Sequence, residues 1–166
     1  MANWGTQRNG RGLGFAYLDY SGTQLAGVAE VSVDRTSGAI KVHRFWCTID
    51  CGVAVQPDNV IAQTESSIVY GLGLALMERI DIEDGRVKQS NFYDYHVPRM
   101  KDMPELEIKL IPTPNHPTGA GQMATPLLAP SISNGVYQLT GVRLRQQPML
   151  PERVHAALEQ RASAKA

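Results

Sequence analysis

The sequence predicts an α+β domain in which antiparallel strands are packed with two or three helices. Two observations favour this class. The first third of the chain alternates apolar and polar residues with the period of half-buried strands, and it carries turn residues between the alternating runs. Later segments, at residues 57–76, 130–140 and 152–161, repeat apolar residues at helical spacing instead.

Length and composition indicate one globular domain. The chain has 166 residues, of which 43% are hydrophobic and 19% charged, enough for a core of its own. Sixteen Lys and Arg balance sixteen Asp and Glu, so we expect no nucleic-acid partner. No apolar run approaches the ~18 residues of a membrane span, and no signal-peptide pattern is visible. We therefore expect a cytoplasmic chain, or a periplasmic one if it is exported with a partner.

Residues 12–50 predict a three-stranded antiparallel meander with glycine-containing turns between its strands. The parity of the apolar residues changes along the third strand, which predicts a β-bulge near His43 and Arg44. A hairpin is expected over residues 79–90. Residues 105–110 alternate cleanly and predict a further half-buried strand.

The first expected helix begins at Pro57, and Asp58 or Asn59 is expected to satisfy the free N–H groups at its start. Its apolar stripe contains one carboxylate, Glu65, and a carboxylate on such a stripe needs a partner if it is buried. We expect Glu65 to be buried and hydrogen-bonded; the alternative is that it belongs to a site. Gly71 and Gly73 are expected to thin the helix for close packing. The stripe's apolar members are Ile61, Ile68, Leu72 and Leu76.

Pro130 suits the first turn of the second helix, and Gly141 suits its C-cap. The expected inner face consists of Ile132, Val136 and Leu139. A C-terminal helix follows over residues 152–161, with Val154 and Leu158 on one side.

No metal ligands are predicted on this chain. Cys47 and Cys51 are its only cysteines, whereas a structural zinc site or an iron–sulfur cluster needs about four ligands. We expect two buried thiols. His96 has no second histidine at ligand spacing, so we expect a structural role for it. The aromatic-rich residues 91–96 could line a pocket.

Residues 117–126 carry two glycines one residue apart, with prolines on both sides. Such a segment suits neither a helix nor the middle of a sheet. It can bring bare backbone close to a ligand, with Gln122 as the polar side chain at its tip. The simpler alternative is a surface loop.

Several segments, in this order, resemble the molybdenum hydroxylases, the xanthine dehydrogenase and aldehyde oxidase family. The resemblance is greatest to large subunits of the isoquinoline 1-oxidoreductase type. It covers residues 11–151, with 1–10 as a lead-in and 152–166 as a C-terminal helical tail. It implies an α+β molybdopterin cofactor-binding domain of that family. The segments are Ile49-Asp50-Cys51-Gly52, Ala62-Gln63-Thr64-Glu65, Gly71-Leu72-Gly73-Leu74-Ala75-Leu76, Asn91-Phe92-Tyr93-Asp94-Tyr95, Ala129-Pro130-Ser131-Ile132-Ser133-Asn134 and Thr140-Gly141-Val142-Arg143-Leu144-Arg145.

The resemblance implies a molybdenum–molybdopterin cofactor shared with the remaining part of the large subunit. Gln63 corresponds to the family glutamine at the cofactor, and Ala120 and Gly121 to the backbone that approaches the metal. Gln122 occupies the position of the family's glutamate base. The implied activity hydroxylates N-heterocycles or oxidises aldehydes with water as the oxygen source. Electrons would leave through iron–sulfur clusters on a small partner subunit.

Two departures from the family pattern bear on this activity. Gln122 is an amide and cannot act as a general base at accessible pH. Ser66 and Ser67 replace a usual glycine pair, which we expect to add bulk where the cofactor comes close. The alternatives are a non-catalytic module that holds the cofactor or assists assembly, and a structural remnant that binds nothing.

Overall fold

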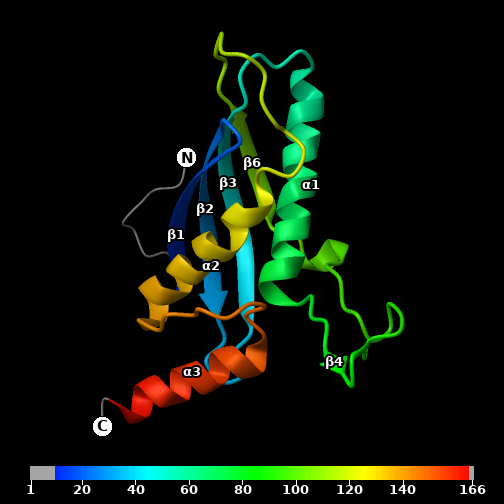
Figure 1. Cartoon of the computed structure of the whole chain (residues 1–166). Coiled ribbons are helices and arrows are strands. Elements are labelled where there is room, and N and C mark those ends of the chain that lie inside the picture. Colours follow the sequence, from blue (N-terminus) through cyan, green and yellow to red (C-terminus); the bar gives the residue numbers. More distant parts are fainter. Residues whose placement is uncertain (1–9, 165–166) are drawn as a thin grey trace.

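The structure, a computed structural model, describes residues 10–164 and contains a mixed four-stranded sheet with two long helices on one face and the C-terminal helix beyond one end of the sheet (Figure 1). The strand order is β1-β2-β3-β6. This arrangement confirms the α+β class. The sheet strands are β1 (Gly12–Tyr20), β2 (Thr23–Val33), β3 (Ile40–Asp50) and β6 (Glu105–Leu110), and the helices are α1 (Pro57–Leu76), α2 (Thr125–Thr140) and α3 (Pro151–Ser163).

The strands β1, β2 and β3 pair antiparallel, as expected, but β6 pairs parallel with β3. A parallel neighbour requires a long crossover connection. Here α1 and the segment after it return the chain to the end of the sheet where β3 begins (Figure 1). The expectation of purely antiparallel strands is therefore wrong at β6. Of the lead-in 1–10, all but Gly10 lies outside the described residues, and the division into lead-in, domain and tail stays a prediction.

The β-bulge in β3 is confirmed at His43. Glu30 pairs with Arg44 while Val31 pairs with Val42, so His43 is the extra residue. Its Nε2 lies 2.7 Å from Ser32 Oγ. The inserted residue restores the parity of β3, which keeps the apolar residues on both sides of the bulge on the core face.

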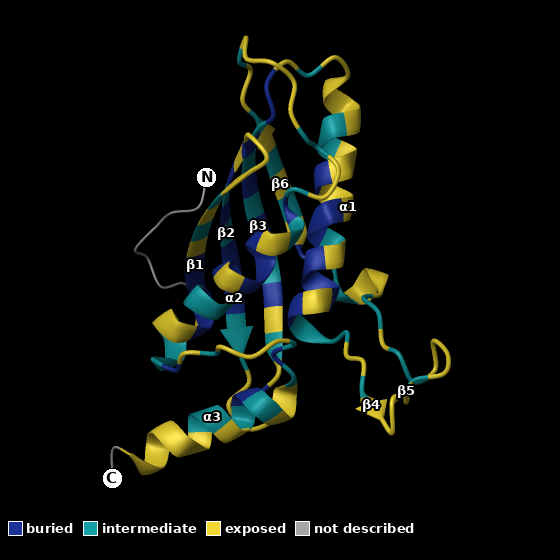
Figure 2. Ribbon diagram, viewed as in Figure 1, coloured by how far each residue is buried: buried dark blue, intermediate teal, exposed yellow. Residues whose placement is uncertain are grey.

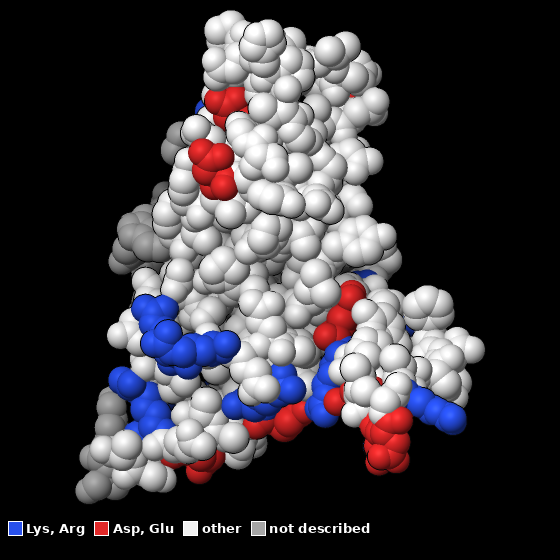
Figure 3. Space-filling view, viewed as in Figure 1, with Lys and Arg blue, Asp and Glu red and all other residues white. Residues whose placement is uncertain are grey.

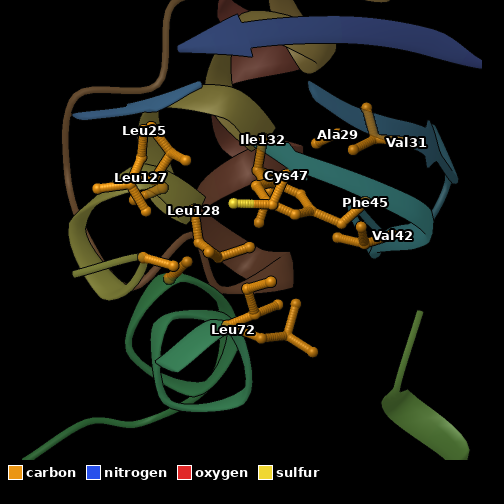
Figure 4. Packing of buried hydrophobic residues seen from close by; sticks show 14 of the residues in the cluster. Leu25, Ala29, Val31, Val42, Phe45, Cys47, Leu72, Leu127, Leu128 and Ile132 are labelled. Carbon is orange, nitrogen blue, oxygen red and sulfur yellow. The ribbon is translucent and has the colours of Figure 1, made fainter. Parts of the chain in front are cut away.

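The core lies between this sheet face and the helices α1 and α2 (Figures 2 and 4). A Cβ added at Gly14 would lie 1.9 Å from the Ser131 oxygen, so the backbones of β1 and α2 approach more closely than a side chain permits. The largest fully buried side chains include Leu25, Phe45 and Ile49 from the sheet, Ile68 and Leu72 from α1, and Leu127, Leu128 and Ile132 from α2.

The expectation that Glu65 is buried is wrong, because its side chain is exposed. The buried side of α1 is rotated around the helix axis relative to the predicted stripe, since small residues face α2 and allow close packing. A Cβ on Gly71 would lie 2.6 Å from the Thr125 oxygen, which confirms its packing role. The buried residues of α1 are Thr64, Ser67, Ile68, Gly71, Leu72, Gly73 and Ala75.

The start of α1 also differs from expectation. Its N-cap is Gln56, no side chain caps it, and Pro57 occupies the first turn. Neither Asp58 nor Asn59 therefore acts as a cap. Proline at this position removes one of the N–H groups that would otherwise need an acceptor, so less capping is required.

The helix α2 begins at Thr125, earlier than expected, and Pro130 lies inside it. Pro126 fills the first-turn position that Pro130 was expected to occupy. Gly141 is confirmed as the C-cap: it has φ 67°, and its N–H donates to the Tyr137 oxygen at 2.7 Å. The C-terminal helix is also confirmed, with Val154 of α3 fully buried.

The expected hairpin is present as a small arm that projects beside the end of α1 (Figure 1). It consists of β4 (Ile82–Glu83) and β5 (Arg86–Val87). A short 3-10 helix, η1 (Met100–Asp102), precedes β6.

Candidate functional site

The glycine-containing loop, residues 111–124, is anchored first along the end of β3. The Ile111 N–H donates to the Ile49 oxygen at 2.8 Å. The Thr118 N–H donates to the Cys51 oxygen at 2.9 Å. These backbone bonds hold the first half of the loop against the segment that leads into α1.

Side chains reinforce this anchor at Asp50. Its carboxylate accepts hydrogen bonds from the Gly52 N–H at 3.0 Å and from Thr113 Oγ1 at 2.9 Å. Gly52 has φ 76°, and a Cβ there would lie 2.1 Å from the His116 oxygen. Glycine is therefore required for the close approach of the two segments.

A buried threonine at the start of β2 holds the middle of the loop. Thr23 is fully buried, and its hydroxyl donates to the Gly119 oxygen at 2.5 Å. Thr23 Oγ1 also lies 2.7 Å from Thr118 Oγ1, and Thr118 is the donor in this second bond because the single hydrogen of the Thr23 hydroxyl is given to Gly119. Thr23 therefore fixes the last residue before the tip of the loop.

The far end of the loop is held by α1. The Thr125 N–H donates to Ser67 Oγ at 2.8 Å, and Thr125 Oγ1 lies 3.1 Å from both the Ser67 hydroxyl and its backbone oxygen. Ser67 is buried. Its side chain is thus engaged at the start of α2, and the expectation that the serine pair adds bulk at the cofactor stays a prediction. Ser66, in contrast, is exposed.

Between these anchors the tip of the loop faces outward. Ala120 is half-buried against the core, whereas Gly121 and Gln122 are exposed. A Cβ on Gly121 would meet nothing within 4 Å. The tip thus offers open backbone and one amide side chain on a support held at both ends.

Gln63 lies on the same side of α1 as Ser67, because residues four apart in a helix lie one above the other. Its side chain is exposed. Gln122 lies three residues before Thr125 and Gln63 one turn before Ser67, so each precedes the Ser67–Thr125 contact by about one helical turn or less of chain. Sequence reasoning missed the anchoring roles of Thr23 and Ser67, because the hydrogen bonds of these hydroxyls to distant residues leave no local signal.

The chain carries no metal-ligand cluster in residues 10–164. Cys47 and Cys51 are free and buried, as expected. Burial raises the pKa of Cys47 to about 12 and also raises the pKa of Cys51. Both thiols are therefore protonated at neutral pH.

Charge is unevenly distributed over the face that carries the loop. In Figure 3, Lys and Arg gather in the lower part, towards α3 and the C-terminal end of α2, with some Asp and Glu beside them, while the upper part shows acidic patches and almost no Lys or Arg.

The aromatic-rich segment 91–96 lines a separate cleft of about 380 Å³, to which Phe92 and Tyr95 contribute, as the sequence suggested. Tyr95 donates to Glu78 Oε2 at 2.8 Å. His96 is exposed, in contrast to the structural role expected for it. This cleft lies beside the C-terminal end of α1, away from the loop tip (Figure 1).

Fold and site together define a molybdopterin-binding domain. The chain belongs to the molybdopterin cofactor-binding domain family, whose model matches residues 2–104. It is 39% identical over 86% of its length to isoquinoline 1-oxidoreductase subunit beta from Brevundimonas diminuta. It is 35% identical over 80% of its length to a membrane-bound aldehyde dehydrogenase (pyrroloquinoline-quinone) from Gluconacetobacter polyoxogenes.

Among solved structures, quinoline 2-oxidoreductase from Pseudomonas putida 86 shares the fold, with a TM-score of 0.77 over 83% of this chain at 24% identity. The chain spans 18% and 17% of the two curated relatives and 19% of the quinoline enzyme's chain. It therefore corresponds to a part of a large molybdenum hydroxylase subunit. None of the helices in residues 10–164 is both long and apolar enough to cross a membrane.

Proposed function

We propose that the chain forms one wall of the molybdenum–molybdopterin site of a molybdenum hydroxylase, together with the remaining part of the large subunit. The enzyme would hydroxylate N-heterocycles or oxidise aldehydes with water as the oxygen source. An iron–sulfur small subunit would accept the electrons. One observation carries the proposal: loop 111–124 is anchored at both ends, its tip is exposed, and the anchor at its far end is Ser67, one turn from Gln63 on α1.

The residues at the tip fit such a cofactor. Gly121 has open space where a side chain would stand, so the cofactor can approach the backbone there. The amides of Gln63 and Gln122 can each donate and accept hydrogen bonds, which suits the mixed polar edge of a pterin. Ser67 does not obstruct the approach, because its hydroxyl is bonded to Thr125.

In this proposal Gln63, Ala120 and Gly121 hold the cofactor, and Gln122 faces the reacting groups. The bound molybdenum would supply the redox chemistry and activate the water. The Gln122 amide can orient water or substrate through hydrogen bonds, but it cannot take up a proton at accessible pH. In this proposal the chain therefore orients the cofactor and substrate, but it lacks the general base that a carboxylate would provide.

Substitution of Gln122 by glutamate tests this assignment. Gln122→Glu is made in the enzyme assembled with all partner segments, and turnover of N-heterocycles and aldehydes is measured with an artificial electron acceptor. General-base assistance is typically worth ~10²–10⁴ in rate, so we expect turnover to rise by at least about 10² with unchanged molybdenum content.

Gln160→Glu, on the exposed face of α3, is the matched control and should leave turnover unchanged. If the wild-type enzyme already turns over at the rate of Gln122→Glu, Gln122 does not stand at the position of the base.

The amide at Gln122 also favours a second candidate function, because an amide cannot act as the base. This candidate is a non-catalytic module that holds the cofactor or assists assembly. Such a module would bind molybdenum in the assembled complex, yet Gln122→Glu would not produce turnover. The compartment would follow the partner: cytoplasmic, or periplasmic if the chain is exported together with it.

A further inference from the structure

The C-terminal half of α1 has the composition of a helix that is buried on all sides. Residues 68–76 are Ile, Val, Tyr, Gly, Leu and Ala alone. Helices at a protein surface carry polar residues on their outer side, whereas a helix that is apolar all round is normally buried. Yet Tyr70 is 65% exposed and Leu74 is 48% exposed.

Rotation of α1 cannot bury these two residues. Its opposite side is already committed to the core through Ile68 and Leu72. A Cβ on Gly71 would meet the Thr125 oxygen at 2.6 Å, so the contact with α2 leaves no room for the helix to turn. Within residues 10–164, therefore, the outer side of α1 stays open, as Figure 2 shows along its edge.

The open side continues from the proposed cofactor site. Gln63, Ser66, Tyr70 and Leu74 are spaced by three, four and four residues, so they form one line along the helix. All four are exposed. A protein segment that closes over Gln63 would reach Tyr70 one to two turns further along the same line.

A lipid surface fits the exposed side of α1 less well than a protein surface does. The first half of α1 exposes Asp58 and Glu65, which would have to enter the membrane interface with it. In contrast, more than four-fifths of the matched relative lies outside the part that this chain covers, since the chain spans 18% of it.

We infer that Tyr70 and Leu74, the α1 apolar face, form the docking surface for the remaining part of the large subunit, the same part that closes the cofactor site. This inference rests on the proposed function. The partner surface would be an apolar groove with a polar group at its edge for the Tyr70 hydroxyl, since a partly buried tyrosine usually keeps a hydrogen-bond partner.

The test is a pull-down with a defined probe. The tagged chain is co-expressed with isoquinoline 1-oxidoreductase subunit beta from Brevundimonas diminuta, from which the region matched by this chain has been removed. The variant is Tyr70→Asp combined with Leu74→Asp. The matched control is Ile82→Asp combined with Val87→Asp, because these apolar residues of the arm are 72% and 55% exposed.

We expect the wild-type chain and the control to retain the probe, and the α1 variant to lose it by about tenfold or more, as for substitutions at interface hot spots. Thermal melts of the isolated chains check folding. Tyr70→Ser, which adds no charge, is measured beside the double variant and should weaken retention in the same direction.

Equal retention by the α1 variant, an equal loss in the control, or no retention by the wild-type chain would overturn the inference. Light scattering of the chain alone tests whether a second copy of this chain occupies the surface instead. A dimer that the α1 substitutions dissociate would also overturn the inference. Molybdenum content of the complex is measured separately. A complex that forms but holds no molybdenum would contradict the proposed function and leave the docking surface standing.

Discussion

Two adjacent serines of α1 have opposite surroundings. Ser66 is exposed, whereas Ser67 is buried and accepts a hydrogen bond from the Thr125 N–H. That N–H belongs to the first turn of α2, where intrahelical acceptors are lacking. Ser67 therefore acts as a cap supplied from a neighbouring helix, in a position where no local side chain caps α2.

Removal of this hydroxyl should cost stability. Ser67→Ala takes away the shorter of the two hydrogen bonds that the Thr125 N–H makes, the other being to the Gln122 oxygen at 3.1 Å. We expect a decrease of roughly 1 kcal/mol in the free energy of unfolding, measured with urea. Ser66→Ala is the control and should stay within about 0.5 kcal/mol of wild type. Equal midpoints for the two variants would contradict the capping role.

At the scale of elements, loop 111–124 owes its shape to bonds with other segments rather than to its own turns. Backbone bonds attach it to the end of β3, and Thr23 attaches Gly119 to the start of β2. Among the described hydrogen bonds, none joins the tip, residues 120–122, to a segment beyond the adjoining start of α2. A rigid support with an exposed tip is what a ligand-binding loop requires.

Thr23→Val should loosen the tip without disturbing the core, because valine has the shape of threonine but no hydroxyl. The Gly119 oxygen would lose its donor. We expect faster hydrogen–deuterium exchange at the amides of residues 119–122, with exchange in α3 unchanged as the internal reference. Thr36→Val, in the exposed β2–β3 turn, is the matched control. Unchanged exchange at the tip would show that Thr23 does not hold it.

At the scale of the whole molecule, one side of the proposed site is open. The tip and the Gln63 turn of α1 are exposed, and the chain spans less than a fifth of the two curated relatives. Small-molecule sites usually bury most of the surface of their ligand. A single wall of this kind can orient a cofactor, but it buries little of the cofactor's surface.

We therefore predict that the chain alone does not retain the cofactor. The purified chain should contain far less than one molybdenum per molecule by elemental analysis after dialysis. The same chain assembled with the remaining part of the large subunit serves as the comparison. Stoichiometric, dialysis-resistant metal on the isolated chain would refute the prediction.

Much of the sheet could be predicted because its signals are local. Side-chain parity located the strands and also the bulge at His43, since one inserted residue reverses the parity of every residue that follows. Gly141 marked the end of α2 because a left-handed C-cap favours glycine. The parallel pairing of β6 has no such signal, because it depends on the path of the chain through α1.

The sequence by itself determined the family, the order of the elements and the residues at the loop tip, because these depend on which residues follow one another. Tertiary structure decided which side of α1 is buried. The close approach of α2 at Gly71 turned small residues inward and left Glu65 in solvent. It also decided where α2 begins, since Ser67 supplies the acceptor for the Thr125 N–H from a part of the chain 58 residues away. Contacts of this kind carry no pattern in the local sequence, so their partners become evident only when the helices pack.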